Sequence, residues 1–363
     1  MRILTVSHFF ESHGGGIERV AGQLCRQFVS LGAKSAWLAS DADPTPAGGI
    51  ETVPIRCMNP IERYTGLPMP IPGVRGVRAM SREIGRSDAV IIHDALYITS
   101  ILAMLIAKTR SKRVIIIQHI AAIPFASATL RVLMKLANAV VTRPMLRAAD
   151  ERIFISDTVR HELLGPRSQL GELLFNGVDT TIFYPASKKR TSSERSASRR
   201  LLFVGRYVEK KGLRVLRALA EARPDMSFFM AGDGPIQPNS WGLPNVHDLG
   251  PQKQADLAEL YRSVDLLILP SVGEGYPLVI QEAMACGLPA ICGTPTDRAD
   301  PATAGWVRGV EIDLAQSRQS ALRCAEAIDT FRPSASERAK MSDYARRRYS
   351  WGLMAQRLLV AAQ

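Results

Sequence analysis

Cysteines are few in this sequence of 363 residues, and long apolar runs are missing from it. The five cysteines are odd in number and show no Cys-x-x-Cys spacing, which predicts small core residues in a reducing compartment, neither disulfides nor zinc ligands. No stretch approaches the roughly 18 uninterrupted apolar residues that a membrane-spanning helix needs. The sequence starts with Met1-Arg2-Ile3-Leu4 and runs directly into a strand-like segment, without a signal peptide's apolar region, which predicts a cytoplasmic protein.

Acidic residues are also outnumbered, with 34 Asp and Glu against 46 Lys and Arg, giving a net charge of +12. The surplus lies almost wholly in residues 1–200, so an anionic partner is expected to meet the first half of the chain. The Gly-x-Gly-x-x-Gly pattern is absent, which argues against a dinucleotide cofactor. We expect no cofactor and no nucleic-acid partner.

The length favours two domains, each large enough to bury a core. The first half alternates strand-like and helical segments, as parallel sheets with crossover helices do. Its strand candidates are Arg2–Ser7, Ser35–Ala39, Ala89–His93, Val114–His119 and Arg152–Ile155. The second half repeats the pattern from Leu201. We therefore expect an α/β protein with one domain over 1–185, a basic linker over 186–200, a second domain over 201–345, and a terminal helix over 346–363.

The most informative stretch is 267–292, LILPSVGEGYPLVIQEAMACGLPAIC. A buried strand stops at Pro270, Pro277 suits the first position of a helix that reaches Cys286, and Gly287 supplies a left-handed stop. Glu274 lies between two glycines after the carboxyl end of that strand, where open α/β sheets bind ligands.

This arrangement suggests a chemistry. The backbone N–H groups of Leu278 and Val279, at the helix start, favour an anion such as a diphosphate. A carboxylate such as Glu274 is suited to accept hydrogen bonds from hydroxyls instead, and a sugar on a nucleotide diphosphate offers both groups. Glu282, farther along the helix, has the plainer alternative of an acidic surface position.

The segment GEGYPLVIQEAMACGLP resembles the donor-site signature of retaining glycosyltransferases of family 4. The resemblance implies the GT-B architecture, two Rossmann-like, doubly wound parallel-sheet domains facing one another across a cleft. It also implies that Glu274 contacts the donor sugar and Glu282 the ribose, and that the terminal helix over 346–363 returns to the first domain and is anchored by Trp351. The implied reaction transfers the sugar with retained anomeric configuration, with no metal and no protein nucleophile.

A second segment, VGRYVEKKG, resembles the phosphate-binding segment of the same family. Arg206 follows a strand and Lys211 comes five residues later, which places two cations beside the turn that holds Glu274. Cations already in position stabilise charge that develops on a departing diphosphate. The alternative is that Lys210 and Lys211 are solvated surface residues.

In the first half, Gly14-Gly15-Gly16 precedes a helix that starts near Ile17. Glycines let a backbone approach a ligand closely, although a merely flexible turn is the alternative. The family resemblance implies that Gly15 and Gly16 face the donor phosphates and the acceptor.

Three polar residues end strands in the same half. His93, Asp94 and His119 follow apolar runs whose carboxyl ends meet at one edge of a sheet, so they are expected to point into the same crevice. The resemblance places His119 against the donor sugar, and we take Asp94 as a substrate-binding residue. Histidines at strand ends are also often satisfied edge residues.

Two further segments bear on partners. Residues 41–80 are rich in proline and glycine, which predicts a long irregular loop. The family resemblance implies acceptor-side variation in this segment. Its Asp41 and Asp43 match a metal-binding pair only superficially, and we predict no metal. Residues 124–149 are helical and basic in pattern, and a solvated helix face is the plainer interpretation of any single charge. Together with the charge surplus of this half, and because related enzymes that elongate lipid-linked sugars dock in this way, we expect peripheral contact with an anionic membrane.

We therefore expect a glycosyltransferase acting on a nucleotide sugar and a saccharide or lipid-linked saccharide acceptor, in polysaccharide or glycolipid biosynthesis at the cytoplasmic face of a membrane. Two alternatives stay open: a nucleotide-sugar epimerase or phosphorylase of the same fold, and a non-catalytic nucleotide-sugar-binding module. The sequence after Gly293 departs from the family's usual glycine-rich turn, so the residues do not fix the donor sugar, its base or the acceptor.

Overall fold

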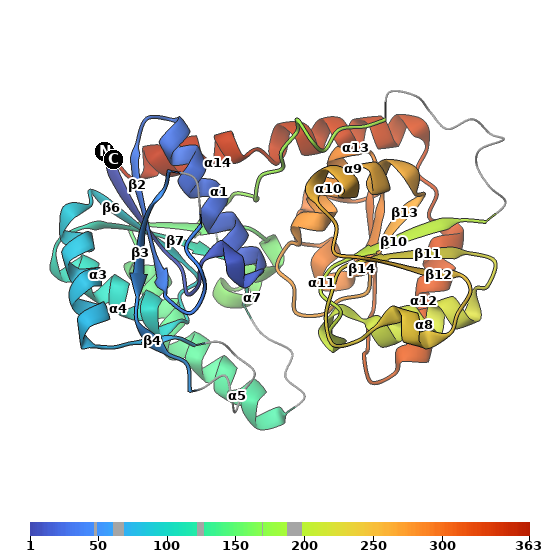
Figure 1. The fold of residues 1–363 in the computed structure, drawn as a ribbon, viewed down its shortest axis with the longest axis horizontal. Coiled ribbons are helices and arrows are strands. Elements are labelled where there is room, and N and C mark those ends of the chain that lie inside the picture. Colours follow the sequence, from blue (N-terminus) through green and yellow to red (C-terminus); the bar gives the residue numbers. More distant parts are fainter. Residues whose placement is uncertain (47–48, 61–68, 122–126, 169, 187–197) are drawn as a thin grey trace. The chain divides into compact units, whose positions relative to one another are not determined.

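The computed structural model describes residues 1–46, 49–60, 69–121, 127–168, 170–186 and 198–363. These residues divide into two compact units (Figure 1). Unit 1 comprises Met1–Asn176 together with Trp351–Gln363, and unit 2 comprises Gly177–Ser350. Each unit contains a parallel sheet with helices packed on its faces, so the expected α/β class with two Rossmann-like domains is confirmed.

The described part of unit 1 contains a seven-stranded sheet in the order β3-β2-β1-β6-β7-β8-β9, with every neighbouring pair parallel. Its strands are β1 (Arg2–Val6), β2 (Lys34–Ser40), β3 (Glu51–Ile55), β6 (Ala89–His93), β7 (Arg113–Gln118), β8 (Glu151–Phe154) and β9 (Glu172–Leu173). All five predicted strands are present, within a residue of the predicted bounds. Every residue of β6 is buried, as expected for a strand covered on both faces.

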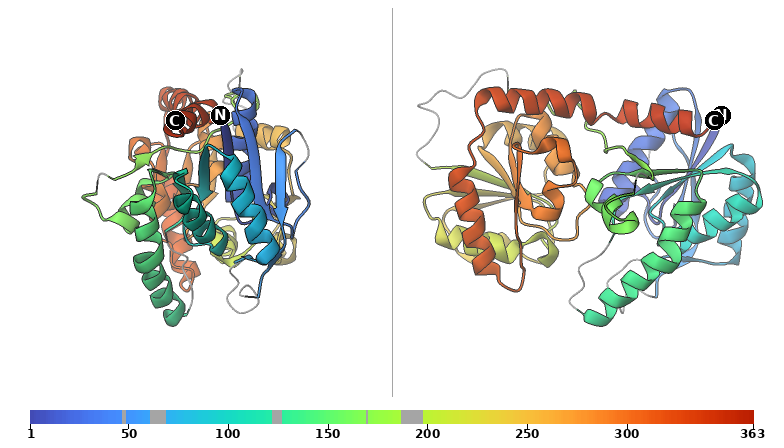
Figure 2. Two further views of the ribbon diagram at one scale, coloured as in Figure 1. Left: turned by 90° about the vertical axis from the view of Figure 1, so that its left-hand side faces the viewer. Right: turned by 180° about the vertical axis from the view of Figure 1, so that it is seen from behind.

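The helices of unit 1 follow the strands as crossovers. They are α1 (Gly16–Ser30), α3 (Val74–Arg86), α4 (Ile98–Thr109), α5 (Ala128–Ala137), a π-helical turn η2 (Asn138–Thr142), α6 (Arg143–Ala148) and α7 (Asp157–Leu164). The terminal helix α14 (Trp351–Ala361) also belongs to this unit and packs against α1, and Trp351 is buried. Figure 2 shows α14 and α1 from two further sides.

The described part of unit 2 contains a six-stranded parallel sheet in the order β12-β11-β10-β13-β14-β15. Its strands are β10 (Arg200–Val204), β11 (Ser227–Ala231), β12 (Val246–Gly250), β13 (Leu266–Leu269), β14 (Ala290–Gly293) and β15 (Val307–Val310). Its helices are α8 (Leu213–Ala222), α9 (Gln254–Ser263), α10 (Leu278–Ala285), α11 (Thr294–Asp297), α12 (Ser317–Thr330) and α13 (Ala335–Arg348). In both units the strand order reverses beside the first strand, which is where doubly wound sheets bind ligands.

The structure divides the chain at other residues than the sequence predicts. The segment from Gly177 belongs to unit 2 because the backbone N–H of Val178 donates to the carbonyl of Tyr349 at 2.9 Å and Phe183 packs against Tyr261. At the far end of the expected linker, Arg199 donates to the carbonyl of Phe331 at 2.8 Å. Residues 187–197 of that linker lie outside the described residues. The chain passes back from unit 2 to unit 1 between Ser350 and Trp351, because α13 continues to Arg348.

The prediction that residues 41–80 form one irregular loop is wrong. Strand β3 extends the sheet at its edge, where Pro54 is tolerated because one side of the strand needs no ladder hydrogen bonds. Two short strands, β4 (Cys57–Met58) and β5 (Ile71–Pro72), pair antiparallel, and α3 begins at Val74. Residues 61–68 of this segment lie outside the described residues. The prolines and glycines obscured an edge strand and a helix start.

Candidate functional site

Glu274 lies in the loop between β13 and α10, as the sequence predicts. Pro277 adopts an extended conformation and caps the helix, so α10 starts at Leu278, one residue later than predicted. Leu278 and Val279 are then its first two residues, whose N–H groups precede the first intrahelical bonds. Gly287 has φ +77°, which confirms the predicted left-handed stop.

Lys211 contacts Glu274 directly. The Nζ atom of Lys211 lies 3.0 Å from Oε1 of Glu274, and the two side chains are only 14% and 15% exposed. The alternative that Lys211 is a solvated surface residue is therefore wrong. Among the described residues, none gives Oε1 of Glu274 a well-aligned hydrogen bond, so this oxygen holds a charge contact and keeps acceptor capacity for a ligand hydroxyl.

The position of Lys211 follows from the turn that carries it. Lys211 ends a 3₁₀ turn, η3 (Glu209–Lys211), and Gly212 follows with φ +77°. A Cβ atom at Gly212 would lie 2.2 Å from the carbonyl oxygen of Pro270, so only glycine lets the turn pack on the end of β13. The N–H of Val272 donates to the carbonyl of Lys210 at 2.9 Å, which ties this turn to the loop of Glu274.

Two other cations belong to the same cluster. Burial lowers the pKa of Lys210 below its usual range; the Glu274 carboxylate opposes this shift, and the charges of Lys211 and Arg206 add to it. Arg206 is exposed. Two lysines thus lie close to one carboxylate next to a helix start, and the charge of Arg206 is near enough to act on Lys210. This arrangement has a net attraction for a polyanion.

Glu282 is buried in unit 2, where the hydroxyl of Tyr261 donates to its Oε2 atom at 3.2 Å. A buried, hydrogen-bonded carboxylate does not belong to an acidic surface face, so that alternative is excluded. Its expected contact with a ribose remains a prediction.

A buried tyrosine network supports the Glu274 loop, and sequence reasoning missed it. The hydroxyls of Tyr276 and Tyr349 lie 3.0 Å apart, and the hydroxyls of Tyr349 and Tyr344 each donate to Oδ2 of Asp300 at 2.7 Å. Tyr276 comes two residues after Glu274, so the network fixes the loop close to the candidate site. Its other members are distant in sequence, and no spacing could have linked them to Tyr276.

In unit 1 the carboxyl ends of β6 and β7 bring three predicted residues together, as expected. The Nδ1 atom of His93 lies 3.0 Å from Nε2 of His119, and both imidazoles are buried. Burial lowers the pKa of His93 to about 3, and it also lowers the pKa of His119. Both rings are therefore neutral near pH 7, which lets one donate a hydrogen bond to the other.

Asp94 has the most unusual environment of these residues. Its φ of +58° lies in the left-handed region that non-glycine residues rarely adopt. Its Oδ1 atom accepts hydrogen bonds from the N–H groups of His119 at 2.7 Å and Ile120 at 3.3 Å. Its Oδ2 atom is buried and has no partner among the described residues. Burial raises the pKa of Asp94 from 3.8 to about 7.

The glycine loop before α1 differs from the expected open anion site. A Cβ at Gly15 would lie 2.0 Å from Oε2 of Glu18, so this glycine makes room for a carboxylate of the same chain. The Oε1 atom of Glu18 lies 2.9 Å from Nε2 of His8, and the His8 ring stacks on Tyr97. Although burial raises the pKa of Glu18, the hydrogen bond and charge of His8 hold it below the usual range. Gly16 has open space on its Cβ side. A negative charge therefore occupies the start of α1.

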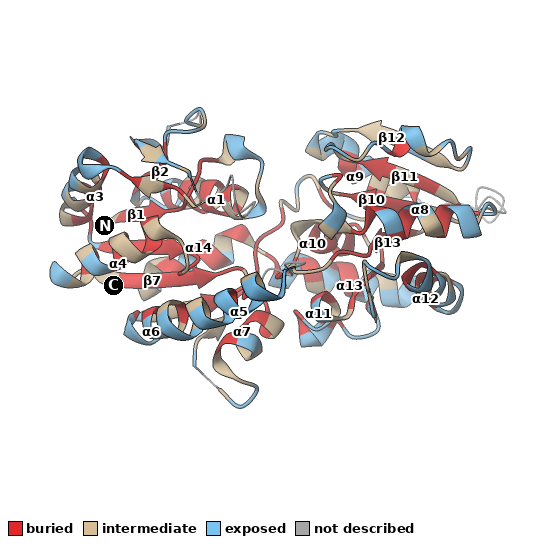
Figure 3. Ribbon diagram, turned by 90° about the horizontal axis from the view of Figure 1, so that it is seen from below, coloured by how far each residue is buried: buried red, intermediate tan, exposed pale blue. Residues whose placement is uncertain are grey.

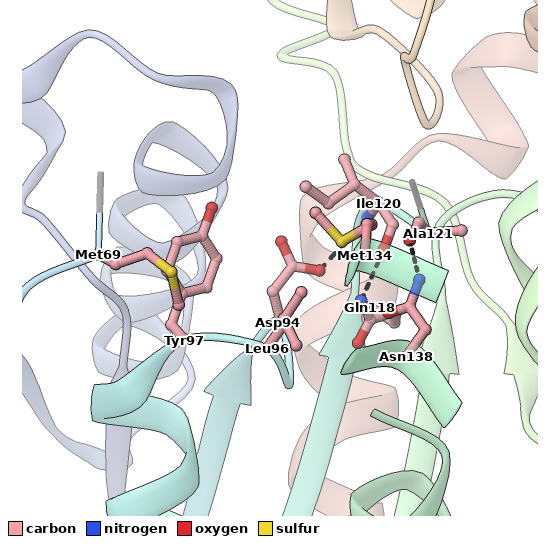
Figure 4. A pocket seen from close by; sticks show the side chains of 9 residues that line it. All are labelled: Met69, Asp94, Leu96, Tyr97, Gln118, Ile120, Ala121, Met134 and Asn138. Carbon is pink, nitrogen blue, oxygen red and sulfur yellow. Dashed lines mark hydrogen bonds between the residues drawn. The ribbon is translucent and has the colours of Figure 1, made fainter. Parts of the chain in front are cut away.

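A small pocket, partly open to solvent, is lined by residues of unit 1 (Figure 4). Figure 4 shows the Asp94 carboxylate in the middle of the lining, with Met69 and Tyr97 on one side and Ile120 and Met134 on the other. The remaining lining residues are Leu96, Gln118, Ala121 and Asn138. Asp94 is the one residue of this lining that the sequence singled out.

Several expectations concern metals, cysteines and membranes. In the described ranges no three His, Cys, Asp or Glu side chains come together as metal ligands would. Asp43 contacts His13 at 3.0 Å, and Asp41 accepts from the N–H of Cys57 at 3.4 Å, as polar loop residues do. All five cysteines are free thiols and four are buried. Over the part of the chain that the structure describes, every helix is too short or too polar to cross a bilayer.

The chain forms two doubly wound domains, and one of them has a helix start and a cationic turn beside a carboxylate. These features define an α/β protein suited to nucleotide-type ligands. The model of the family "Glycosyltransferase Family 4" matches residues 14–182, and that of "Glycosyl transferases group 1" matches residues 198–321. The chain belongs to glycosyltransferase family 4 and has the GT-B fold. Gly15, Gly16, Asp94 and His119 lie in its first domain, and the other predicted site residues lie in its second.

Individual relatives agree with this assignment. A D-inositol 3-phosphate glycosyltransferase of Mycobacterium marinum is 31% identical over 164 residues, which cover 39% of this chain and 34% of that protein. A GDP-mannose-dependent alpha-mannosyltransferase of Corynebacterium glutamicum is 31% identical over 160 residues, covering 42% and 38%. The matched segment thus spans little more than a third of each relative. A solved sucrose-phosphate synthase of Thermosynechococcus elongatus has a similar fold, with TM-score 0.72, 17% identity and 100% of both chains covered.

Proposed function

We propose that this protein transfers a sugar from a nucleotide diphosphate sugar to a saccharide or lipid-linked saccharide acceptor, with retention of the anomeric configuration. The observation that carries the proposal is the contact of Lys211 with Glu274 beside the start of α10. This contact places a cation for phosphate and a carboxylate for sugar hydroxyls within one hydrogen-bond length of each other. A nucleotide diphosphate sugar presents both phosphate oxygens and sugar hydroxyls to such a site.

The diphosphate is the leaving group in this proposal. Arg206, Lys211 and the N–H groups of Leu278 and Val279 bind it, and they stabilise the negative charge that grows as the glycosidic bond breaks. The amides are fixed by α10 and Lys211 is fixed by the Gly212 turn, so little reorganisation is needed during the reaction. The start of α1 is a poorer phosphate site, because the Glu18 carboxylate lies there.

The sugar and the nucleoside are held by other residues. Glu274 and His119 hold the sugar, and Glu282 holds the ribose. The bond between the anomeric carbon and the diphosphate oxygen breaks, and the acceptor oxygen forms a bond to that carbon on the same face. The acceptor proton passes to the departing phosphate oxygen, so the reaction needs neither a protein nucleophile nor a metal.

A relative named as a GDP-mannose-dependent alpha-mannosyltransferase supports a nucleotide diphosphate sugar as the class of donor. A thermal-shift screen against sugars of uridine, guanosine and adenosine diphosphate identifies the donor. Release of nucleoside diphosphate in the presence of EDTA and mixed acceptors then tests transfer, and product NMR reports the anomeric configuration. Stabilisation by a donor without any turnover would favour a binding module, and a changed sugar on an intact donor would favour an epimerase.

We also propose that the protein works at the cytoplasmic face of a membrane, in polysaccharide or glycolipid assembly. Four apolar side chains on α5 and η2, Val132, Leu133, Leu136 and Val140, are 56% to 66% exposed. Their spacing places them on one side of the helix, roughly opposite the buried Met134. Figure 3 shows α5 largely exposed, and Figure 2 shows it extending away from the sheet of unit 1.

The charges beside this apolar side support an anionic lipid surface as its partner. Arg131 and Lys135 are exposed on α5, one helical turn apart, and Arg147 is exposed on α6. Basic side chains flanking an apolar stripe are typical of helices that lie in the interface of an anionic bilayer.

A further inference from the structure

We propose that His93 is a positioning residue for the transfer reaction: it holds Nε2 of His119, so that Nδ1 of His119 is the ring atom left to meet the donor sugar. This inference rests on the proposed function, in which His119 holds that sugar. It adds a second histidine to the same site and says which atom of the first one acts. The sequence placed His93 in the same crevice but gave it no role.

The pairing of β6 with β7 brings the two histidines together. His93 is the last residue of β6 and lies opposite Ile117 of β7 in the parallel register. Side chains alternate along a strand, so His119, two residues after Ile117, returns to the face that Ile117 shares with His93. The register of the sheet therefore accounts for the contact between the two rings.

The contact has the geometry of a hydrogen bond between two rings. The Nδ1 atom of His93 lies 3.0 Å from Nε2 of His119, the ring centroids are 5.2 Å apart, and the ring planes differ by 18°. The centroid separation is close to the N···N distance plus the two ring radii, so the contact lies in the planes of both rings. The N–H and the lone pair of an imidazole point in that plane. Because burial lowers the pKa of both histidines, both rings are neutral near pH 7, and one nitrogen donates while the other accepts.

His119 is held through its backbone as well. The Oδ1 atom of Asp94 accepts from the N–H of His119 at 2.7 Å, and the N–H of Asp94 donates to the carbonyl of Ile117 at 2.9 Å. His93 and Asp94, which are successive residues, thus hold the ring and the main chain of His119. Both histidines are buried, and a group fixed in this way needs little reorganisation when a sugar binds.

The pairing decides which atom of His119 reaches the sugar. An imidazole has two nitrogen atoms, and Nε2 of His119 is engaged by His93, so Nδ1 is left for a sugar oxygen. The bond at one ring nitrogen also sets the protonation of the other. His93 acts on the sugar only through the ring that it orients.

Amide side chains at position 119 test the assignment of the atoms. The amide of asparagine lies near the position of Nδ1, whereas that of glutamine reaches the position of Nε2. His119→Asn therefore keeps a polar group for the sugar, and His119→Gln keeps one for His93. We expect single-turnover transfer by His119→Asn to be about tenfold faster than by His119→Gln, as the loss of one buried hydrogen bond allows. Equal rates, or the reverse order, would overturn the assignment of Nδ1.

A second pair of variants tests the role of His93. His93→Asn keeps a polar group near Nδ1, whereas His93→Leu keeps a similar volume and removes it. We expect transfer to be about tenfold slower in His93→Leu and within about threefold of the wild type in His93→Asn. His247→Leu, at an exposed histidine of β12, is the control and should leave the rate unchanged. An equal fall in the two variants of His93 would indicate a packing role and overturn the proposal, as would a normal rate in His93→Leu.

The ring itself is observed by NMR of the full chain with ¹⁵N-labelled histidine, which separates protonated from unprotonated ring nitrogens. We expect His119 to populate one tautomer in the wild type and a mixture of both in His93→Leu. One unchanged tautomer in that variant would show that His93 does not fix the ring. This measurement needs no donor. Failure of the wild type to bind or cleave any nucleotide sugar would defeat the proposed function, whereas normal transfer with an unchanged tautomer in His93→Leu defeats only this inference.

Discussion

The ammonium group of Lys211 lies 3.0 Å from the carboxylate of Glu274, although the two residues belong to separate loops of unit 2. In the absence of a ligand each charge compensates the other. A bound diphosphate supplies a stronger partner for the lysine, and the carboxylate is then left to the hydroxyls of the sugar. The pair thus couples recognition of the two ends of a sugar diphosphate.

Replacing Lys211 by methionine removes the charge and keeps most of the volume. A hydrogen bond to a charged group contributes about 1.5–3 kcal/mol, so Lys211→Met should weaken nucleoside diphosphate binding by roughly 10- to 150-fold. The corresponding nucleoside without phosphates should bind as it does to the wild type. Calorimetry measures both, with Lys340→Ala on the exposed side of α13 as the control. Equal losses for nucleoside and diphosphate would remove Lys211 from phosphate recognition.

The tyrosine network beneath the Glu274 loop predicts a stability effect. Tyr349→Phe leaves Tyr276 without that hydroxyl partner and removes one of the donors to Asp300. Since these groups are buried, we expect the unfolding free energy of unit 2 to fall by about 1–3 kcal/mol. Tyr184→Phe, which removes a hydroxyl from an exposed tyrosine, should change it little. Urea unfolding of the three proteins provides the comparison, and equal midpoints would contradict a supporting role for the network.

Asp94 predicts a pH dependence of stability. Its pKa is about 7 in the folded protein and near 3.8 when unfolded, so between these values the folded state holds a proton that the unfolded chain has released. The stabilising contribution is complete below about pH 4 and is lost as the pH rises through 7. Asn also tolerates the left-handed backbone, and Asp94→Asn stays neutral at every pH.

The variant should therefore gain stability relative to the wild type between pH 5 and about pH 8, by an amount on the order of a few kcal/mol. Thermal melts at a series of pH values measure the difference. Parallel profiles for the two proteins would show that Asp94 is ionised in the folded protein throughout this range.

The α5 surface predicts membrane binding that depends both on its exposed apolar side chains and on charge. Leu133→Asp and Leu136→Asp each remove apolar contact and add repulsion, so binding to vesicles that contain anionic lipid should fall at least tenfold. Leu322→Asp, at an equally exposed leucine of α12, should leave binding intact. Sedimentation with vesicles at low and high salt gives the measurement. The same loss for all three variants would point to a general effect of hydrophobicity, and no loss would exclude α5.

The sequence predicted those parts of the molecule whose cause is local. The run Ala89–His93 is apolar throughout because both faces of β6 are covered, and Gly287 follows α10 because its φ is positive. Lys211 and Glu274 were predicted as neighbours because each follows a strand of one sheet, and their carboxyl ends share an edge. Strand β3 was missed because Pro54 and the flanking glycines hide an edge strand.

Contacts that depend on the path of a loop or on the packing of distant segments could not be predicted in this way. The pairing of His8 with Glu18, and the packing of Glu18 over Gly15, depend on the path of the loop before α1. The bonds from Tyr344 and Tyr349 to Asp300 depend on how α13 lies against its neighbours. For the same reason the pocket beside Asp94 needs the structure, since its lining comes from four separate segments.

The most direct test of the central claim is single-turnover transfer by Glu274→Gln, with the donor that the thermal-shift screen identifies. The amide keeps the shape of the side chain but loses the charge that holds the sugar hydroxyls and pairs with Lys211. We predict that the rate falls at least 100-fold while the affinity for the nucleoside diphosphate stays within a few-fold of the wild type. A rate close to that of the wild type would contradict the assignment of Glu274 to the reacting sugar.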